Sequence, residues 1–365
     1  MGRLLGLSVA IAALSCGGNK TTAPTTDPAG SATTAGSATT PAGSATPPVT
    51  PAVPVAAGSP PRAIAAAEVA GDVSCGPFKT GAFAAKDQAL LDDRIRFRFL
   101  PGGTMNGGPE SAKIEVTSGA FTMFVGAREL LQRGDAQFPQ HAAKNALFDG
   151  GYEAVSITGR DASIIAGLLS KGTGNPEIVA LAHGWFLDPN GDVLDVAIFA
   201  SGITDANLAE CRQFALKILS TVGPGARRLA FATGTDTETE VSYSKFKYKL
   251  PADWILMSSQ GIHDFARMQF RKRGIYPNGY TSLQVGLDSH PGDWKSPGSP
   301  DGTRPGTVFG LSATWSLTKD ASGPLFGAWT ISKDVVKRDH AVASITSTTA
   351  ADRDEAIKLA ESIRR

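Results

Sequence analysis

Stretches in which apolar and polar side chains alternate recur along this chain, and they predict β-strands. Residues 94–100 read Arg-Ile-Arg-Phe-Arg-Phe-Leu, which has the two-residue period of a half-buried strand. Residues 178–187 and 193–200 are apolar runs on either side of Asn190-Gly191, a dipeptide that favours a hairpin turn. We therefore expect antiparallel sheets connected by tight turns.

Two longer stretches have apolar residues three or four positions apart and predict amphipathic helices. The first has an N-cap at Thr204 or at the aspartate that follows it, and it extends to about residue 221. The second follows Thr348 or Thr349 and closes the chain. A shorter helix is expected over residues 138–148.

The order of these elements occurs twice. A basic-aromatic strand that ends in Leu-Pro lies at 96–101 and again at 247–251, and a strand, a threonine-rich cap and a helix follow at 197–220 and 341–362. We interpret this as an internal duplication, with two unrelated α+β domains as the alternative. The predicted fold class is α+β: two similar domains, each an antiparallel sheet with a C-terminal amphipathic helix packed on it.

The expected domain boundaries follow from shifts in composition. A first domain is predicted over residues 75–222 and a second over 241–365, with a polar connector at 223–240. Within the second domain, residues 288–307 are rich in Gly, Pro and Asp and predict a long loop.

Both predicted domains resemble the PsbP-like α/β/α sandwich, whose members include an extrinsic photosystem II subunit, a Ran-binding nuclear protein and bacterial envelope lipoproteins. The matching residues are Leu100-Pro101, the 250–254 segment Leu-Pro-Ala-Asp-Trp, and the final strand and helix. The resemblance covers nearly all of 90–222 and 241–365. It implies a binding or assembly role and names no catalytic residue.

The N-terminus has the layout of an export signal, with Arg3 before an apolar run at residues 4–14. The run ends in Ala13-Leu14-Ser15-Cys16, which resembles the lipobox of bacterial lipoproteins. The resemblance implies cleavage before Cys16 and acylation of that cysteine, for example with palmitate, so that several acyl chains hold the protein on a membrane. Gly17, where aspartate would retain an enterobacterial lipoprotein in the inner membrane, implies the outer membrane. The expected location is thus the bacterial cell envelope, where the lipid would anchor the protein to the outer membrane, with the periplasm as the associated compartment.

Residues 17–62 are almost wholly Ala, Thr, Ser, Gly and Pro, with a short Ala-Gly-Ser-Ala-Thr repeat. Such a segment cannot bury enough apolar surface to offset the entropy of ordering. It is interpreted as a disordered tether, about 40 Å long as a random coil. A glycosylated stalk is the alternative.

The chain has 3 cysteines, and lipid attachment to Cys16 would leave Cys75 and Cys211. Exported proteins form disulfides, so a Cys75–Cys211 bridge is expected. The alternative is that Cys211 is a buried free thiol on its helix.

The charge balance argues against a nucleic-acid partner, because 35 Lys and Arg against 34 Asp and Glu give a net charge of +1. No apolar run after the N-terminus has the roughly 20 residues that a membrane-spanning helix needs.

Catalytic and metal-binding signatures are not found in the sequence, so we expect no catalytic residue, metal or cofactor. The 5 histidines lack metal-site spacing, and neither Gly-x-Ser-x-Gly nor a P-loop occurs. Arg267, Arg271, Lys272 and Arg273 form a basic cluster, interpreted either as a solvated strand face or as a contact for an anionic partner or lipid headgroups. Trp294 is expected in the long polar loop, where exposure would make it a partner contact.

These observations predict a membrane-anchored envelope lipoprotein that binds an envelope protein or small ligand, or assists assembly, without catalysis. The alternatives are an exported hydrolase whose site is not visible as a motif, and a structural accessory subunit of an envelope complex.

Overall fold

The computed structural model places most of the chain after the predicted tether. It describes residues 60–108, 110–147, 151–172, 177–232, 234, 236–241, 244–262, 265–289, 291, 294–296, 298–321, 325–333 and 340–365. The predicted signal, Cys16 and nearly all of the predicted linker lie outside these residues.

The protein is mostly β. Of the described residues, 52% are in strands and 15% in helices, with 3 α-helices among many sheets. The predicted α+β class, two similar domains each built as a sheet with one helix packed on it, is therefore wrong. The sequence analysis recognised the helices but missed several strands, some rich in glycine and proline and others carrying charged residues.

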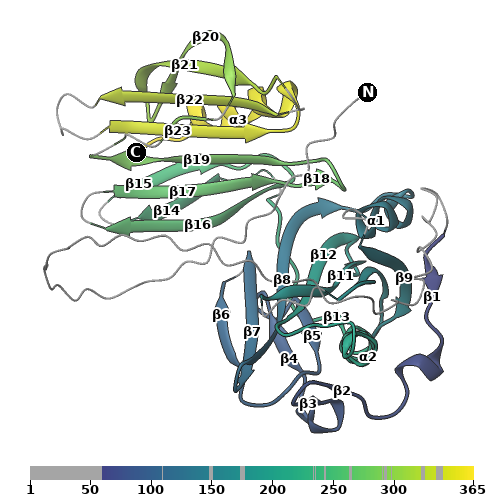
Figure 1. The fold of residues 1–365 in the computed structure, drawn as a ribbon. Coiled ribbons are helices and arrows are strands. Elements are labelled where there is room, and N and C mark those ends of the chain that lie inside the picture. The colour runs from purple at the N-terminus through teal and green to yellow at the C-terminus, as the bar shows by residue number, and fades with distance from the viewer. Residues whose placement is uncertain are drawn as a thin grey trace, which may run out of the picture. The chain divides into compact units, whose positions relative to one another are not determined.

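The first large sheet has 9 strands within the described part of the chain. Eight of them follow one path (Figure 1): β1 (Arg62–Ala63), β9 (Tyr152–Thr158), β10 (Ser163–Leu169), β11 (Val179–Leu187), β12 (Asp192–Ala200), β8 (Phe121–Arg133), β7 (Ser111–Ser118) and β6 (Thr104–Gly107). The other strand, β18 (Gly274–Ile275), pairs in parallel with the end of β8. Strands β11 and β12 form the predicted hairpin, which is confirmed, and Gly191 adopts a positive φ of 78° in its turn.

The second large sheet has 7 strands among the described residues. In spatial order they are β16 (Trp254–Ile262), β17 (Phe265–Lys272), β19 (Thr281–Asp288), β23 (His340–Ser347), β22 (Phe326–Lys333), β21 (Leu311–Lys319) and β20 (Ser299–Val308). The order matches the path β6-β7-β8-β12-β11-β10-β9 of the first sheet, strand for strand. A helix follows the last strand of each series. The shared order favours the internal duplication, which stays a hypothesis.

Smaller elements complete the described fold. The short strands are β2 (Ser74–Cys75), β3 (Phe78–Lys79), β4 (Gln88–Leu90), β5 (Ile95–Phe97), β13 (Gly223–Pro224), β14 (Asp236–Val241) and β15 (Ser244–Lys249). They form the pairs β2-β3 and β14-β15 and the three-stranded sheet β13-β5-β4. Single 3₁₀ turns occur at Ala66–Val69 and Thr80–Ala82.

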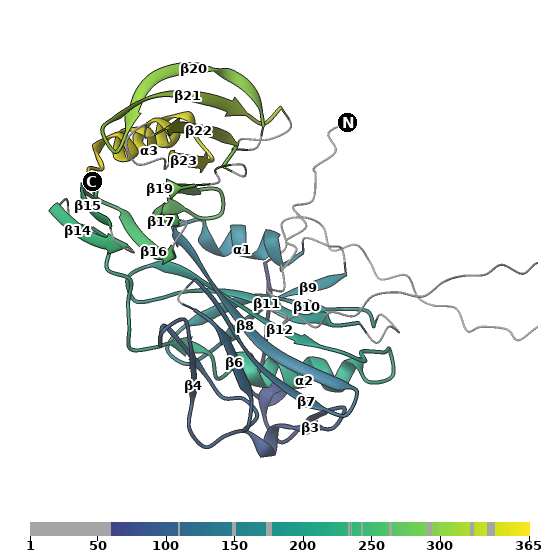
Figure 2. The ribbon, with the colours of Figure 1, turned by 90° about the vertical axis from the view of Figure 1, so that its left-hand side faces the viewer.

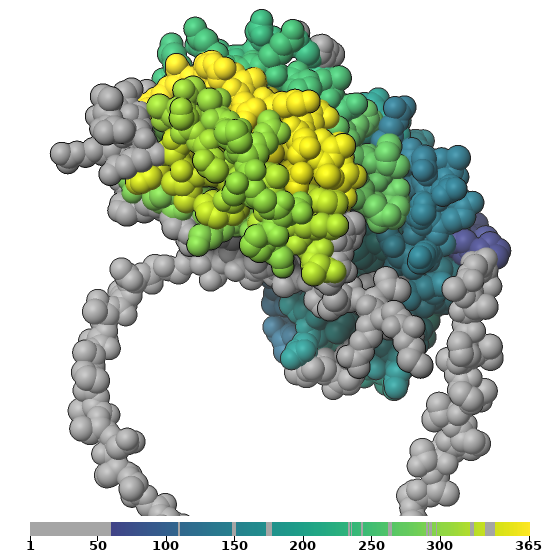
Figure 3. Space-filling model, turned by 90° about the horizontal axis from the view of Figure 1, so that it is seen from above, coloured from purple at the N-terminus to yellow at the C-terminus, as the bar shows by residue number. Residues whose placement is uncertain are grey.

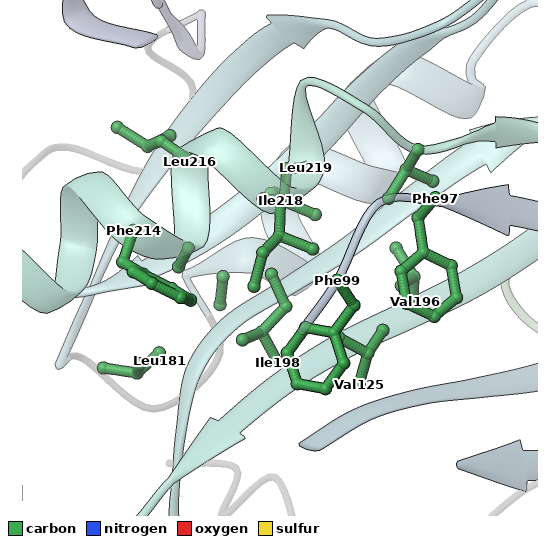
Figure 4. Close-up of a cluster of buried hydrophobic side chains, with 14 of the residues drawn as sticks. Phe97, Phe99, Val125, Leu181, Val196, Ile198, Phe214, Leu216, Ile218 and Leu219 are labelled. Atoms are coloured by element: carbon green, nitrogen blue, oxygen red, sulfur yellow. The ribbon is translucent and has the colours of Figure 1, made fainter. Parts of the chain in front are cut away.

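Helices α1 (Phe138–Ala146) and α2 (Leu208–Leu219) lie on opposite faces of the first sheet (Figure 2). The apolar side of α2, including Phe214 and Ile218, meets Leu181, Val196 and Ile198 from the strands (Figure 4). All five side chains are fully buried. Burial of each such side chain contributes about 1.5–3 kcal/mol, so this contact anchors α2 firmly.

Helix α3 (Ala350–Ser362) closes the second sheet's core, next to β19 and β23. Its N-cap is Thr349, whose Oγ1 accepts a 3.0 Å hydrogen bond from the Asp352 amide. Ala356, Ile357 and Ala360 are buried against the strands. At the surface, the yellow C-terminal segment adjoins the yellow-green strands β20 to β22 (Figure 3).

The loop predicted for residues 288–307 is partly wrong, because residues 299–308 form strand β20. This strand lies at the edge of the sheet and pairs only with β21. An edge strand tolerates Pro300 and Pro305, since the missing N–H groups need not bond to a second neighbour. The glycine and proline content that predicted a loop is therefore compatible with the edge strand that residues 299–308 form.

Three buried clusters divide the hydrophobic core. One contains residues from 75 to 222, and a second contains residues from 241 to 363. The third joins Phe138 of α1 and Trp185 of β11 to Tyr276, which follows β18. The domain boundaries stay a prediction. None of the described helices combines the length and the apolar character that a bilayer crossing requires.

Candidate functional site

The most distinctive polar surface lies on β17, in the second sheet. Ala266, Met268 and Phe270 point into the core and are buried. Because side chains alternate along a strand, Arg267 and Arg271 lie on the other side of the sheet, where both are half-buried. We call this side of β17, with the neighbouring positions of β19 and β23, the polar face.

Aromatic rings hold both arginines of the polar face. The guanidinium carbon of Arg267 lies 4.6 Å from the ring centre of Trp294 and 5.6 Å from that of Phe265. The guanidinium of Arg271 lies 4.2 Å above the ring of Tyr280. Stacking of this kind occupies the faces of the guanidinium, so that its N–H groups bond along its edge.

Neither arginine forms a salt bridge within the described residues, and the nearest acidic influence is the negative charge of Glu110, which acts on Arg271. The Nε atoms of Arg267 and Arg271 are buried and lack a hydrogen-bond partner, and no ion pair involves either side chain in the described part of the chain. Burial lowers the pKa of Arg271 below its usual value, while the electrostatic interactions with Tyr280 and Glu110 act in the opposite direction. A half-buried cation without a hydrogen-bonded carboxylate is unfavourable, so an anion bound here would stabilise it.

Two glutamine side chains lie between the arginines. Gln269 of β17 is directly opposite Gln284 of β19, and Gln284 is opposite Ser344 of β23. Both glutamines are half-buried. The polar face thus offers amide donors and acceptors between two cations.

The structure places Trp294 differently from the prediction. Its side chain is only 4% exposed, and its Nε1 donates a 2.8 Å hydrogen bond to Asp288 Oδ2. The expectation of an exposed contact is wrong, because the segment turns this ring onto the sheet, where it packs on Arg267. Ser296, two residues later, bonds through Oγ to the carbonyl oxygens of Ala328 and Ile345.

The other two residues of the basic cluster do not join Arg267 and Arg271. Lys272 Nζ donates to Asp352 Oδ1 at 2.6 Å and to Glu355 Oε2 at 2.7 Å, which ties β17 to α3. Burial alone would lower the pKa of Lys272, but these two carboxylates raise it. Arg273 forms a 2.5 Å ion pair with Asp192 of the β11–β12 hairpin. Lys272 and Arg273 therefore form ion pairs within the fold and do not belong to the polar face.

Cys75 and Cys211 are at disulfide distance, with Sγ atoms 2.02 Å apart. The pair joins β2 to α2, and both residues are fully buried. The alternative of a free thiol at Cys211 is not what the structure contains. Cys16, the predicted lipidation site, lies outside the described residues.

A second polar group lies on the first sheet. His183 Nε2 is 2.6 Å from Asp195 Oδ1, and Arg128 donates to Asp195 Oδ2 at 2.9 Å. Burial alone would raise the pKa of Asp195, but the contacts with His183 and Arg128 hold it below its usual value. A histidine oriented by a buried carboxylate is the geometry of a general base. Among the described residues no hydroxyl or thiol bonds to His183, so the group lacks a nucleophile.

A buried ion pair supports the same sheet. Arg94 and Glu129 are in contact, and each is less than 5% exposed. Burial lowers the pKa of Arg94 to about 10. This pair lies inside the fold, away from the surface.

Metal ligation finds no support in the described residues, which contain no group of three or more His, Cys, Asp or Glu able to hold an ion. His263 and His290 lie outside them. Comparison with protein-family models, curated proteins and solved structures finds no match for this chain.

The sequence analysis found the two arginines but missed Gln269, Gln284 and Tyr280. The alternation of Arg267, Gln269 and Arg271 along one strand would have placed those three on one face. The pairing of Gln269 with Gln284 depends on strand register, which the sequence of one strand does not reveal.

Proposed function

We propose that this chain is a non-catalytic binding protein of the bacterial cell envelope, anchored by lipid at Cys16, and that it binds an anionic ligand on the polar face. One observation carries the binding proposal: Arg267 and Arg271 are half-buried, stacked on aromatic rings and without a salt-bridged carboxylate among the described residues. In most proteins such cations pair with carboxylates, as Lys272 and Arg273 do here.

Two further features support the location. The Cys75–Cys211 pair is typical of proteins that fold in an oxidising compartment. The N-terminal apolar run followed by Cys16 is typical of a lipoprotein signal. The long tract of residues 17–62 would let the folded part reach ligands away from the membrane surface.

Binding is tested by retention of the full-length Cys16→Ser chain on immobilised polyglutamate at increasing salt concentration. The double variant Arg267→Gln/Arg271→Gln should elute at clearly lower salt. The matched control is Lys245→Gln/Lys247→Gln, which removes the same charge from two exposed lysines of β15. Equal retention of the three proteins would refute a specific role for the polar face.

The anchor is tested by metabolic labelling with palmitate and membrane fractionation of the native chain and Cys16→Ser. Label and membrane association should both be lost in the variant. An unlabelled native chain would refute the lipoprotein proposal while leaving the binding test intact.

A further inference from the structure

We infer that the ligand of the polar face is an acidic oligosaccharide that lies along β17, with one carboxylate at Arg267 and another at Arg271. The inference rests on the proposed function, since it names the ligand class of the same face.

The spacing of the two cations favours separated negative charges. Arg267 and Arg271 are four residues apart on one strand, so their Cα atoms are about 13 Å apart. Neutral amides, from Gln269 and Gln284, occupy the space between them. Nucleic-acid phosphates recur much more closely and would place charges over these amides. The ligand should therefore carry neutral hydrogen-bonding groups between its two anionic groups.

The position of the strands argues against a peptide. Extended peptides that bind to a sheet add to a free edge, where backbone N–H and C=O groups are available. Here β17 pairs with β16 and β19, and β19 pairs with β17 and β23, so both are interior strands (Figure 1). The backbone of the polar face is already hydrogen-bonded, and recognition must come from side chains.

The side chains between the arginines match sugar hydroxyls. A glutamine amide both donates and accepts, as a hydroxyl does. Ser344 continues the row beyond Gln284, and its Oγ is 3.1 Å from Ser296 Oγ. A saccharide that alternates acidic and neutral units would set its carboxylates on the arginines and its hydroxyls on the amides.

The test uses calorimetric titration of the full-length Cys16→Ser chain with three probes: hyaluronan oligosaccharides, neutral chitin oligosaccharides and oligoglutamate. Hyaluronan should bind, because it alternates a uronic acid with a neutral amino sugar, and chitin should not. Arg267→Gln and Arg271→Gln should each weaken hyaluronan binding about tenfold to a hundredfold, as expected for a charge-assisted hydrogen bond. The exposed-lysine control, Lys245→Gln/Lys247→Gln, should bind hyaluronan with an affinity within about twofold of that of the parent chain.

Gln284→Ala separates this inference from the proposed function and also replaces the arginine variants if they fail to fold. It should weaken hyaluronan binding about threefold to tenfold and leave oligoglutamate binding unchanged. A chain that binds oligoglutamate but not hyaluronan, or hyaluronan binding unaffected by Gln284→Ala, would overturn the inference and leave the anion-binding proposal standing. Equal binding of chitin and hyaluronan would also overturn it.

Discussion

Removal of the Cys75–Cys211 disulfide should strongly destabilise α2, the helix that carries Cys211. The two cysteines are 136 residues apart in the sequence, so the bond closes a loop that includes most of the first sheet. In the chain-entropy treatment, a loop of this length stabilises the folded state by about 5 kcal/mol relative to the reduced chain. Cys75→Ala/Cys211→Ala should therefore lower the opening free energy of α2, which carries Cys211, by about that amount.

Native-state hydrogen exchange measures the opening free energy of each backbone amide. Amides of α2 should lose protection in the double variant, while amides of α3, which packs on the other core, should keep theirs. The native chain treated with reductant is the matched control, because it breaks the bond and retains both sulfur atoms. A loss below about 1 kcal/mol at α2, or an equal loss at α3, would refute the reasoning.

Three other predictions concern stability. Glu129→Gln should cost about 3 kcal/mol in urea unfolding, because it leaves the guanidinium of Arg94 buried without its anion, and an undiminished midpoint would contradict this. Thr349→Ala should cost about 1 kcal/mol through loss of the α3 N-cap, and Thr349→Ser should restore it. The pKa of Asp195 is lowered in the folded state, so its stabilisation is present above its unfolded pKa and is lost as the pH falls through the folded value. Asp195→Asn should therefore be less stable than the native chain at pH 7, by about 2 kcal/mol from the lost hydrogen bonds of the carboxylate with His183 and Arg128, and the difference should shrink towards pH 3.

The sequence predicted best those elements whose pattern is local. The hairpin of β11 and β12 and helices α1, α2 and α3 were all recovered, with ends shifted by a few residues. Each has a regular period, and the hairpin and α3 also have a turn or cap residue, Gly191 and Thr349. Information of this kind lies within about ten residues of sequence. The predicted N-cap of α2 at Thr204 or Asp205 is wrong, because the helix begins after Asn207.

Elements that depend on distant partners were missed. Strand β8 (Phe121–Arg133) includes charged residues that a local pattern does not mark as buried strand, because they find partners elsewhere. Arg128 pairs with Asp195 on the next strand, and Glu129 pairs with Arg94. The missed strands also explain why the predicted fold class was wrong. At the polar face, likewise, the exposure of Trp294 and the partner of Gln269 depend on packing between segments far apart in the sequence.

The most direct test of the central claim is nuclear magnetic resonance of the arginine side chains. The Nε–H groups of Arg267 and Arg271 are buried and have no partner in the described structure, so a bound anion should change their signals. Titration of the ¹⁵N-labelled chain with oligoglutamate should shift these two signals together, with one dissociation constant, and leave that of Arg273, which is paired with Asp192, in place. Shifts confined to other arginines, or none at saturating oligoglutamate, would contradict the account.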